Sequence, residues 1–295
     1  MYIVLFDGTL LLSSDLIECV IRTDCVPIPV SVELVVKYND KNIEAMAKGQ
    51  TFTIGSQSYK LEVIHQEVAK HPLQQEGVQY GAIIVTAMLA GCKEIGFFKR
   101  RAIILKDSSL GGIYRACGST VRVANDFTVP RFSCLIGEVA SKSIARVAQE
   151  EGGIIVYREG KINFIRLDDL FTQKPVLTLS DDSLDAIDSG FLERHLIDTF
   201  YSLNAASNIV LGNDKKDRGR TYIPRTSARI LNNLSKCLVT TRKGVIGFNP
   251  SINAGDTITV GDTAMAVITA AHYYAGDASN SPNQYTRLWL GVSEK

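Results

Sequence analysis

Residues 244–292 read GVIGFNPSINAGDTITVGDTAMAVITAAHYYAGDASNSPNQYTRLWLGV, and this stretch decides the fold class. It holds short runs rich in Val, Ile, Thr and Tyr, which are separated by Gly, Asp, Asn and Pro. Runs of period two between turn residues indicate β-strands, here at 245–248, 257–260, 264–274 and 285–292. Strands at such short intervals predict a small barrel or a sandwich.

The composition is that of a folded protein with a large core. The 295 residues are enough for two domains, and 45% of them are hydrophobic. The formal net charge is +1, whereas a dedicated nucleic-acid-binding protein usually carries a strong basic excess. The most apolar run, 81–91, has roughly half of the ~20 residues that a membrane span needs. We therefore expect no membrane segment and no specific contact with nucleic acid.

The N-terminus and the cysteines indicate a protein of the reducing cytosol. Residues 1–6 lack the basic start of a signal peptide, and Asp7 and Asp15 interrupt the apolar run, so we expect no signal peptide. No two cysteines have the C-x-x-C spacing of a zinc or redox site. We expect free and mostly buried thiols at Cys19, Cys25, Cys92, Cys117, Cys134 and Cys237.

The first 130 residues contain mostly strand patterns. Residues 30–38 alternate apolar and polar side chains, which predicts a half-buried strand. Further patterns predict a strand at 1–6 with 10–12 pairing back, a short helix at 42–48, a hairpin of 51–54 with 59–64, and a strand at 101–106. A helix over 110–116 follows the cap cluster 107–109 and ends at Gly118. Residues 78–90 are apolar throughout, so they fit either a buried strand or a buried helix.

After a predicted seam at 125–131 comes the most legible unit of the chain. The apolar stripe over 138–151 predicts an amphipathic helix, which Gly152 and Gly153 end. Strands at 154–157 and 162–165 then flank a tight turn. Paired strands at 195–203 and 209–211 and a helix over 227–238 lead into the C-terminal strands.

One short motif imitates a phosphatase site. The sequence FDGTL at 6–10 matches the second half of the D-x-D-G-T motif of haloacid-dehalogenase-like phosphatases. In that family the first Asp is the nucleophile and a magnesium ligand, and this chain has Leu5 at that position. Leucine cannot attack phosphorus or bind a hard cation, so we interpret Asp7 and Gly8 as a hairpin turn.

Other polar features have ordinary structural interpretations. The acidic run 180–188 lacks the glycine and glutamate of an EF-hand, so we interpret it as the cap of a short helix rather than a calcium site. The basic loop 212–220 is an exposed, solvated or partner-facing loop, with phosphate binding as the alternative. Gly111 and Gly112 serve packing or a hinge, since no phosphate-loop pattern surrounds them. The histidines, none in a metal or catalytic motif, are His65, His71, His195 and His272.

Two stretches carry a family resemblance. One is the helix that ends in two glycines, followed by IIVYREGKINFIRLDDL at 154–170. The other is the closing pattern of HYY at 272–274, a polar loop, and QYTRLWL at 284–290. Together, over roughly 137–170 and 244–290, they resemble the baseplate hub proteins of contractile-tailed bacteriophages and the related spike proteins of type VI secretion systems.

The resemblance implies a β-rich α+β chain with two tube-like small β-barrel domains, packed helices and inserted hairpins. The expected parts are an N-terminal barrel-like domain at 1–130, a helix-plus-hairpin region at 131–243, and strands closing the second barrel at 244–295. It also implies a location in the virion tail baseplate after assembly in the host cytoplasm, with a role in host cell entry. The expected state is a homotrimeric hub that contacts the tail tube, the central spike and the tape-measure protein.

The same resemblance implies a structural protein rather than an enzyme. We predict no catalytic residues, no cofactor and no metal site, because no catalytic motif is present. Two alternatives stay open: a tail tube or adaptor protein of the same machine, and a soluble hydrolase without a recognisable motif.

Overall fold

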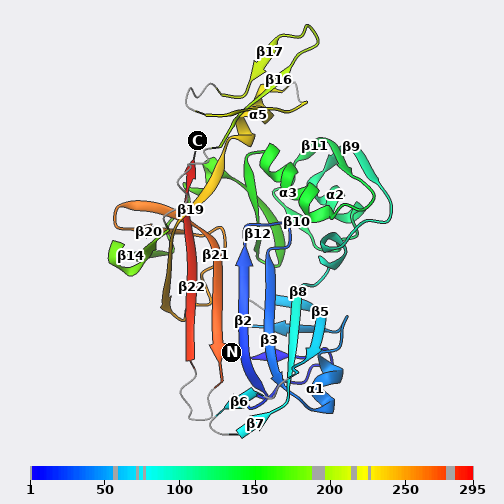
Figure 1. Ribbon diagram of the computed structural model, residues 1–295, viewed down its shortest axis with the longest axis vertical. Coiled ribbons are helices and arrows are strands. Elements are labelled where there is room, and N and C mark those ends of the chain that lie inside the picture. The colour runs from blue at the N-terminus through cyan, green and yellow to red at the C-terminus, as the bar shows by residue number, and fades with distance from the viewer. Residues whose placement is uncertain are drawn as a thin grey trace.

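The computed structural model describes residues 2–55, 59–70, 73–75, 78–187, 197–213, 218–224, 227–276 and 283–294. The chain is a β-rich α+β protein, in agreement with the predicted class. It is elongated, with its longest strands side by side in the middle (Figure 1). Among the described helices, none is both long and apolar enough to cross a membrane.

One large sheet joins strands from both ends of the chain. Its strands are β1 (Ile3–Val4), β2 (Leu16–Asp24), β3 (Val30–Lys37), β4 (Thr51–Ile54), β5 (Tyr59–Val68), β8 (Ala82–Leu89), β14 (Leu177–Leu179), β15 (Asp185–Ala186), β19 (Cys237–Gly247), β20 (Thr257–Val260), β21 (Thr263–Ala275) and β22 (Asn283–Glu294). The order is β1-β4-β5-β8-β3-β2-β21-β22-β19-β15, and β20 joins β14 to β21. All its pairs are antiparallel except β14 with β20.

Smaller sheets and short helices surround this central sheet. The sheets pair β9 (Ile103–Ser109) with β11 (Thr128–Cys134), β13 (Lys161–Arg166) with β12 (Gly153–Arg158) and β10 (Val123–Ala124), β16 (Thr199–Leu203) with β17 (Ile209–Leu211) and β18 (Arg220–Tyr222), and β6 (Leu73–Gln75) with β7 (Val78–Tyr80). The helices are α1 (Asp40–Ala45), α2 (Leu110–Ala116), α3 (Ala140–Glu150), α4 (Leu167–Leu170) and α5 (Ala228–Leu234), with 3-10 turns η1 (Lys93–Gly96) and η2 (Asp181–Ser183).

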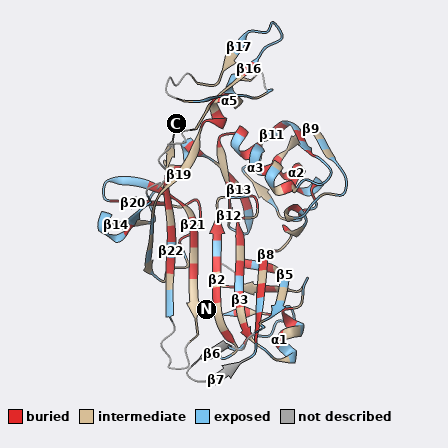
Figure 2. Cartoon of the chain, in the orientation of Figure 1, coloured by how far each residue is buried: buried red, intermediate tan, exposed pale blue. Residues whose placement is uncertain are grey.

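The core lies against one face of the central sheet. In β3 the side chains of Val30, Val32, Leu34 and Val36 are buried, and the residues between them are partly or fully exposed. Figure 2 shows this alternation along β2 and β3. The same core continues into α2, α3 and the β12–β13 hairpin, and a second cluster lies between β20, β21 and β22.

Local sequence rules explain the best-formed helices. The Ser109 hydroxyl accepts a hydrogen bond from the Gly112 backbone N–H at 3.0 Å and so caps α2, as predicted. A Cβ at Gly111 would lie 2.9 Å from an Asp126 carboxylate oxygen, so the glycine permits close packing there. Gly152 follows α3 with a φ of +68°, a left-handed conformation that favours glycine and ends the helix.

A buried carboxylate joins three segments beside α3. Glu151 accepts hydrogen bonds from the Arg229 guanidinium at 2.7 and 2.8 Å, and Arg166 Nη2 lies 3.5 Å from the same carboxylate. The Glu151 side chain is 8% exposed. Bidentate pairing of this kind is among the stronger charge-assisted contacts. It holds α5, and the β16–β17–β18 sheet that packs on α5, to the central part of the molecule.

Most element predictions are confirmed. Residues 78–90, which fitted a strand or a helix, contain the strand β8, paired on both sides with β3 and β5. The turn at Asp7 is confirmed, because Leu10 bridges back to Val4 and Gly8 has a φ of +82°. The hairpins 51–64 and 154–165 are also present.

The helix predicted over 227–238 is shorter than expected. It ends at Leu234, and β19 begins at Cys237, because Leu238 and Val239 pair with Ser293 and Val292 of the last strand. Tertiary pairing outweighs the helical spacing there. Residues 188–196, including His195, lie outside the described residues, and so does His71.

The barrel prediction is not settled by the strand order. Among the described strands the central sheet follows an open path from β1 to β15, and no closed barrel is formed within it. The two tube-like barrels and the domain boundaries at 130 and 243 stay predictions.

Candidate functional site

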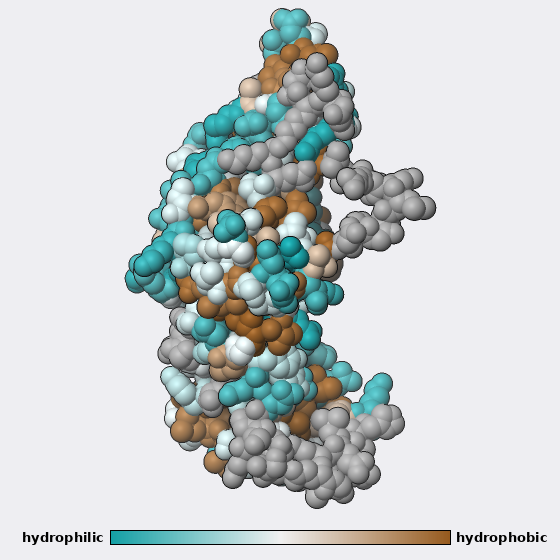
Figure 3. Space-filling model, turned by 90° about the vertical axis from the view of Figure 1, so that its left-hand side faces the viewer, coloured by the Kyte–Doolittle hydropathy of each residue, from teal (hydrophilic) through white to brown (hydrophobic). Residues whose placement is uncertain are grey.

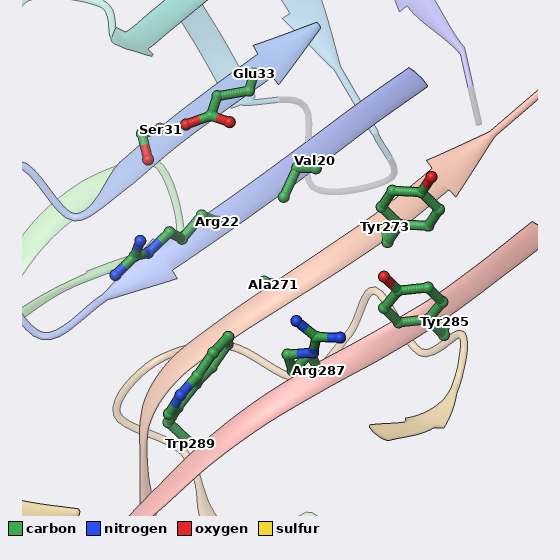
Figure 4. Close-up of a pocket in the computed structure, with 9 residues that line it drawn as sticks. All are labelled: Val20, Arg22, Ser31, Glu33, Ala271, Tyr273, Tyr285, Arg287 and Trp289. Atoms are coloured by element: carbon green, nitrogen blue, oxygen red, sulfur yellow. The ribbon is translucent and has the colours of Figure 1, made fainter. Parts of the chain in front are cut away.

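The face of the central sheet opposite the core carries a band of polar and aromatic side chains. It contains a shallow cavity of about 230 Å³ (Figure 4), which is lined by Val20, Arg22, Ser31, Glu33, Ala271, Tyr273, Tyr285, Arg287 and Trp289. We call these nine residues the polar band. They come from β2, β3, β21 and β22, so the two ends of the chain build it together.

The register of the strands places the polar band in rows. Glu33 is opposite Val20, Val20 is opposite Tyr273, and Tyr273 is opposite Tyr285. In the next row Ser31, Arg22, Ala271 and Arg287 follow one another across the same strands. Because side chains of a strand alternate between faces, residues two apart along each strand share this surface.

Aromatic contacts stiffen one end of the polar band. The rings of Tyr273 and Tyr285 stack with centroids 4.7 Å apart and planes 17° apart. The Arg287 guanidinium carbon lies 5.7 Å from the Tyr285 ring centroid, within cation–π range. Burial, followed by the nearby Glu18, raises the pKa of Tyr273, so its hydroxyl remains a neutral donor at ordinary pH.

The charges of the polar band are mixed. Arg22 Nε lies 2.8 Å from an Asp24 carboxylate oxygen, and Thr269 donates a hydrogen bond to the other oxygen of that carboxylate. Glu33 and Arg287 are exposed on the same face. A surface with both signs interspersed stays hydrated and does not select one sign of ligand.

His272 lies on the opposite, core-facing side of β21. Its ring nitrogens are 3.0 Å from the Thr286 hydroxyl and 3.0 Å from the Ile252 carbonyl oxygen. Burial lowers the pKa of His272 to about 4, so the ring is neutral at pH 7. His272 is therefore a hydrogen-bonded strand residue of the core.

The other sequence candidates are not brought together. Asp7 accepts hydrogen bonds from the backbone N–H and the hydroxyl of Thr9, at 2.9 and 2.7 Å, and these bonds lower its pKa. His65 lies 3.6 Å from Glu67 on the surface. Across the described part of the chain, no three His, Cys, Asp or Glu residues cluster as metal ligands would.

The acidic run lies beside one end of the polar band, because Asp182 and Asp185 line a hollow of about 500 Å³ together with Arg287 and Trp289. The predicted short helix is only the 3-10 turn η2; Asp181 and Asp182 occupy its first turn, and the Ser180 side chain forms no capping hydrogen bond to it. Residues 214–217 of the basic loop lie outside the described residues. Burial raises the pKa of the Cys92 thiol to about 12, and Cys19 and Cys134 are fully buried, which suits inert structural thiols.

Sequence reasoning missed the polar band. The alternating signal was present in 30–38 and 285–290, but it identifies faces within one strand and not which strands become neighbours. The pairing of β2 with β21 joins residues about 250 positions apart, for example Cys19 with Tyr274.

Comparison with solved structures finds the same fold in two tail proteins. The tail protein from Neisseria meningitidis MC58 superposes with a TM-score of 0.69 at 12% identity, covering 99% of this chain and 95% of that chain. The 43 kDa tail protein of prophage MuSo2 from Shewanella oneidensis gives a TM-score of 0.66 at 14% identity, covering 99% and 98%.

A more distant similarity extends to a secretion complex. A chain of the Francisella PdpA–VgrG complex gives a TM-score of 0.55 at 8% identity, covering 97% of this chain and 55% of that chain. No protein-family model matches this sequence, and no curated protein is similar to it. At these identities the comparisons establish the fold, which this chain shares with these two tail proteins.

Proposed function

We propose that this protein is a structural component of a phage-type tail: the trimeric baseplate hub that joins the tail tube to the central spike. One observation carries the proposal. The fold agrees with two tail proteins over nearly the whole length of both chains, with 95% and 98% of those chains covered.

The proposal includes the partners and location that the resemblance implies. The hub sits in the virion tail baseplate after assembly in the host cytoplasm, contacts the tube, the spike and the tape-measure protein, and takes part in host cell entry. The shared fold with a chain of the PdpA–VgrG complex supports a spike-type partner. Two tube-like barrels per chain let three copies match a sixfold tube.

The polar band has a place in this proposal. A tube presents one surface to its channel, and a channel surface must stay hydrated while a chain or nucleic acid passes. The mixed charges of Arg22, Glu33 and Arg287 suit such a surface better than a binding site of one sign. We assign the polar band to the channel side and propose no catalytic role for it.

Imaging tests the proposal. A tail tip, or this chain co-expressed with its spike, should contain a threefold ring with an axial channel at the end of the tube. Six copies per ring would identify a tube or adaptor protein instead, and a peripheral position would contradict the hub. The purified chain should also hydrolyse generic ester and phosphate substrates no faster than the background rate. Turnover that is abolished by substitution of a single residue would favour the hydrolase alternative.

A further inference from the structure

The outer face of the β9–β11 pair is basic and apolar. The inner face of this pair buries Phe132 and Cys134, and the outer face carries Ile104, Lys106, Arg131 and Leu135. Ile104 is 57% exposed and Leu135 is 52% exposed. We call these four outer residues the basic face. Its Arg131 and Leu135 also line a hollow with Glu138 and Glu150 beside α3.

Two cations oppose each other on the basic face. Lys106 is the register partner of Arg131 across the β9–β11 pair. Like charges directly opposite in antiparallel strands destabilise the pair. Within the part of the chain that the structure describes, no carboxylate forms an ion pair with either of them. An anionic group from another molecule would relieve this repulsion.

Exposed apolar side chains continue the basic face on the neighbouring loops. Phe98 is 74% exposed and Ile136 is 72% exposed. Backbone hydrogen bonds of 2.9 Å join Lys99 to Glu138 and Gly137 to Lys99, so these two loops run together. Clustered apolar side chains beside polar ones are typical of protein contacts rather than of small-ligand sites.

The same chain carries a complementary surface at the edge of the central sheet. The segment from 176 to 187 passes through β14, η2 and β15, and its exposed residues include Val176, Asp181, Asp182, Asp185 and Ile187. We call these five residues the acidic edge. The segment has three carboxylates and no cationic residue. Arg242 lies 3.9 Å from Asp181 and Lys243 is the register partner of Asp185, but the Asp181 side chain stays 66% exposed.

The two surfaces lie on different sides of the molecule. β14 and β20 are at the left of Figure 1, and β9 and β11 are at the right. Figure 3 looks at the left side, where hydrophilic and hydrophobic residues alternate over the surface. One copy can therefore contact two neighbours at the same time, as a head-to-tail ring requires.

We propose that the basic face of one copy docks on the acidic edge of the next copy. Lys106 and Arg131 then meet Asp181, Asp182 and Asp185, and the exposed apolar residues of each surface cover those of the other. Electrostatic complementarity of this kind sets the register and the partner. This inference rests on the proposed ring assembly and names the surfaces that form it.

Charge reversal tests the contact in the full-length protein. Sedimentation velocity over a concentration series at low salt should show self-association of the native chain. The double variant Lys106→Glu with Arg131→Glu should weaken the association constant by about tenfold or more, and so should Asp181→Lys with Asp185→Lys. Mixing the two double variants should restore association, because each then supplies the surface that the other needs.

A matched control separates this contact from net charge. Lys60 and Lys161 are exposed on β5 and β13, so Lys60→Glu with Lys161→Glu changes the charge by the same amount elsewhere. This control should associate as the native chain does, and circular dichroism should show that every variant is folded. A native chain that stays monomeric throughout, or reversed variants that associate unchanged, would overturn the docking proposal.

The outcome is separable from that of the hub proposal. If tail imaging finds the threefold ring but the reversed variants still assemble into it, the hub stands and this contact is wrong. If the charge-reversal pattern holds but the chain is absent from the tail tip, the contact stands and the hub is wrong.

Discussion

The two faces of the central sheet are built from the same strands but have different tasks. On β3, Leu34 is fully buried against the core, and the adjacent Glu33 points into the polar band on the other side. The core face is held by hydrophobic burial and close packing, which tolerate little change. The polar band is held by its strands, so its side chains are free to serve a surface role. A single residue step along β3 thus separates the core from the surface that we propose lines the channel.

The largest effect is expected on the core face. Leu34→Ala should reduce the free energy of unfolding by about 2–5 kcal/mol, because it removes buried methyl groups and leaves a cavity. Urea unfolding measures this loss. The matched variant Glu33→Ala, one residue away on the open face, should change stability by less than about 0.5 kcal/mol. Equal losses in both variants would remove the distinction between the faces.

The second prediction concerns pH and His272. Its pKa is about 4 in the folded chain and near 6.5 in the unfolded chain, so the unfolded chain binds more protons between these values. The contribution of neutral His272 to the free energy of unfolding is fully present above pH 6.5 and is lost as the pH falls toward 4. It amounts to about 3 kcal/mol.

Urea unfolding at pH 7 and at pH 4.5 checks this. Between pH 7 and pH 4.5, the free energy of unfolding should fall by about 2 kcal/mol more in the native chain than in His272→Gln. A variant with the same pH dependence as the native chain would show that the ring is already charged or exposed in the fold.

A smaller effect is expected for the stacked tyrosines of the polar band. A double-mutant cycle of Tyr273→Ala and Tyr285→Ala should give a coupling free energy of about 0.5–1.5 kcal/mol. The stacking distance of 4.7 Å and the direct cross-strand register are the reasons. Zero coupling, measured by urea unfolding of the four proteins, would mean that the rings do not stack in solution.

The smallest effect is expected at Arg22. Its side chain is 55% exposed, and its ion pair with Asp24 is open to solvent and salt. Arg22→Ala should therefore lower the free energy of unfolding by less than about 1 kcal/mol, and by even less in high salt. A loss as large as that of Leu34→Ala would indicate that the polar band contributes to folding after all.

Local patterns predicted the local elements well. The alternation in Val30–Lys37, the stripe of α3 and the turn between β12 and β13 are each visible in a few consecutive residues. The long-range pairs were not predictable in this way. The neighbour of β2 is β21, and nothing in Leu16–Asp24 specifies a strand more than two hundred residues later. The polar band depends on that pairing, so sequence patterns could not identify it.

The Lys106–Arg131 opposition was hidden for the same reason. Both residues lie in short polar-apolar runs, and only the β9–β11 register makes them neighbours. The extent of β19 was missed because helical spacing over 227–238 continues past the point where pairing with β22 takes over. A sequence pattern within one segment does not show whether that segment pairs with a strand elsewhere in the chain.

The contacts of Glu151 with two arginines restrict the segment of chain that lies between those arginines. Arg166 and Arg229 precede and follow a long stretch that includes the acidic edge and the β16–β17–β18 sheet. By holding both arginines, one carboxylate closes that stretch into a loop without a covalent bond. Loss of these ion pairs would return conformational entropy to the part of the loop that no strand of the central sheet holds. Glu151 thus limits the freedom of α5 and of the β16–β17–β18 sheet, whereas β14 and β15 of the acidic edge are fixed separately by their pairing with β20 and β19.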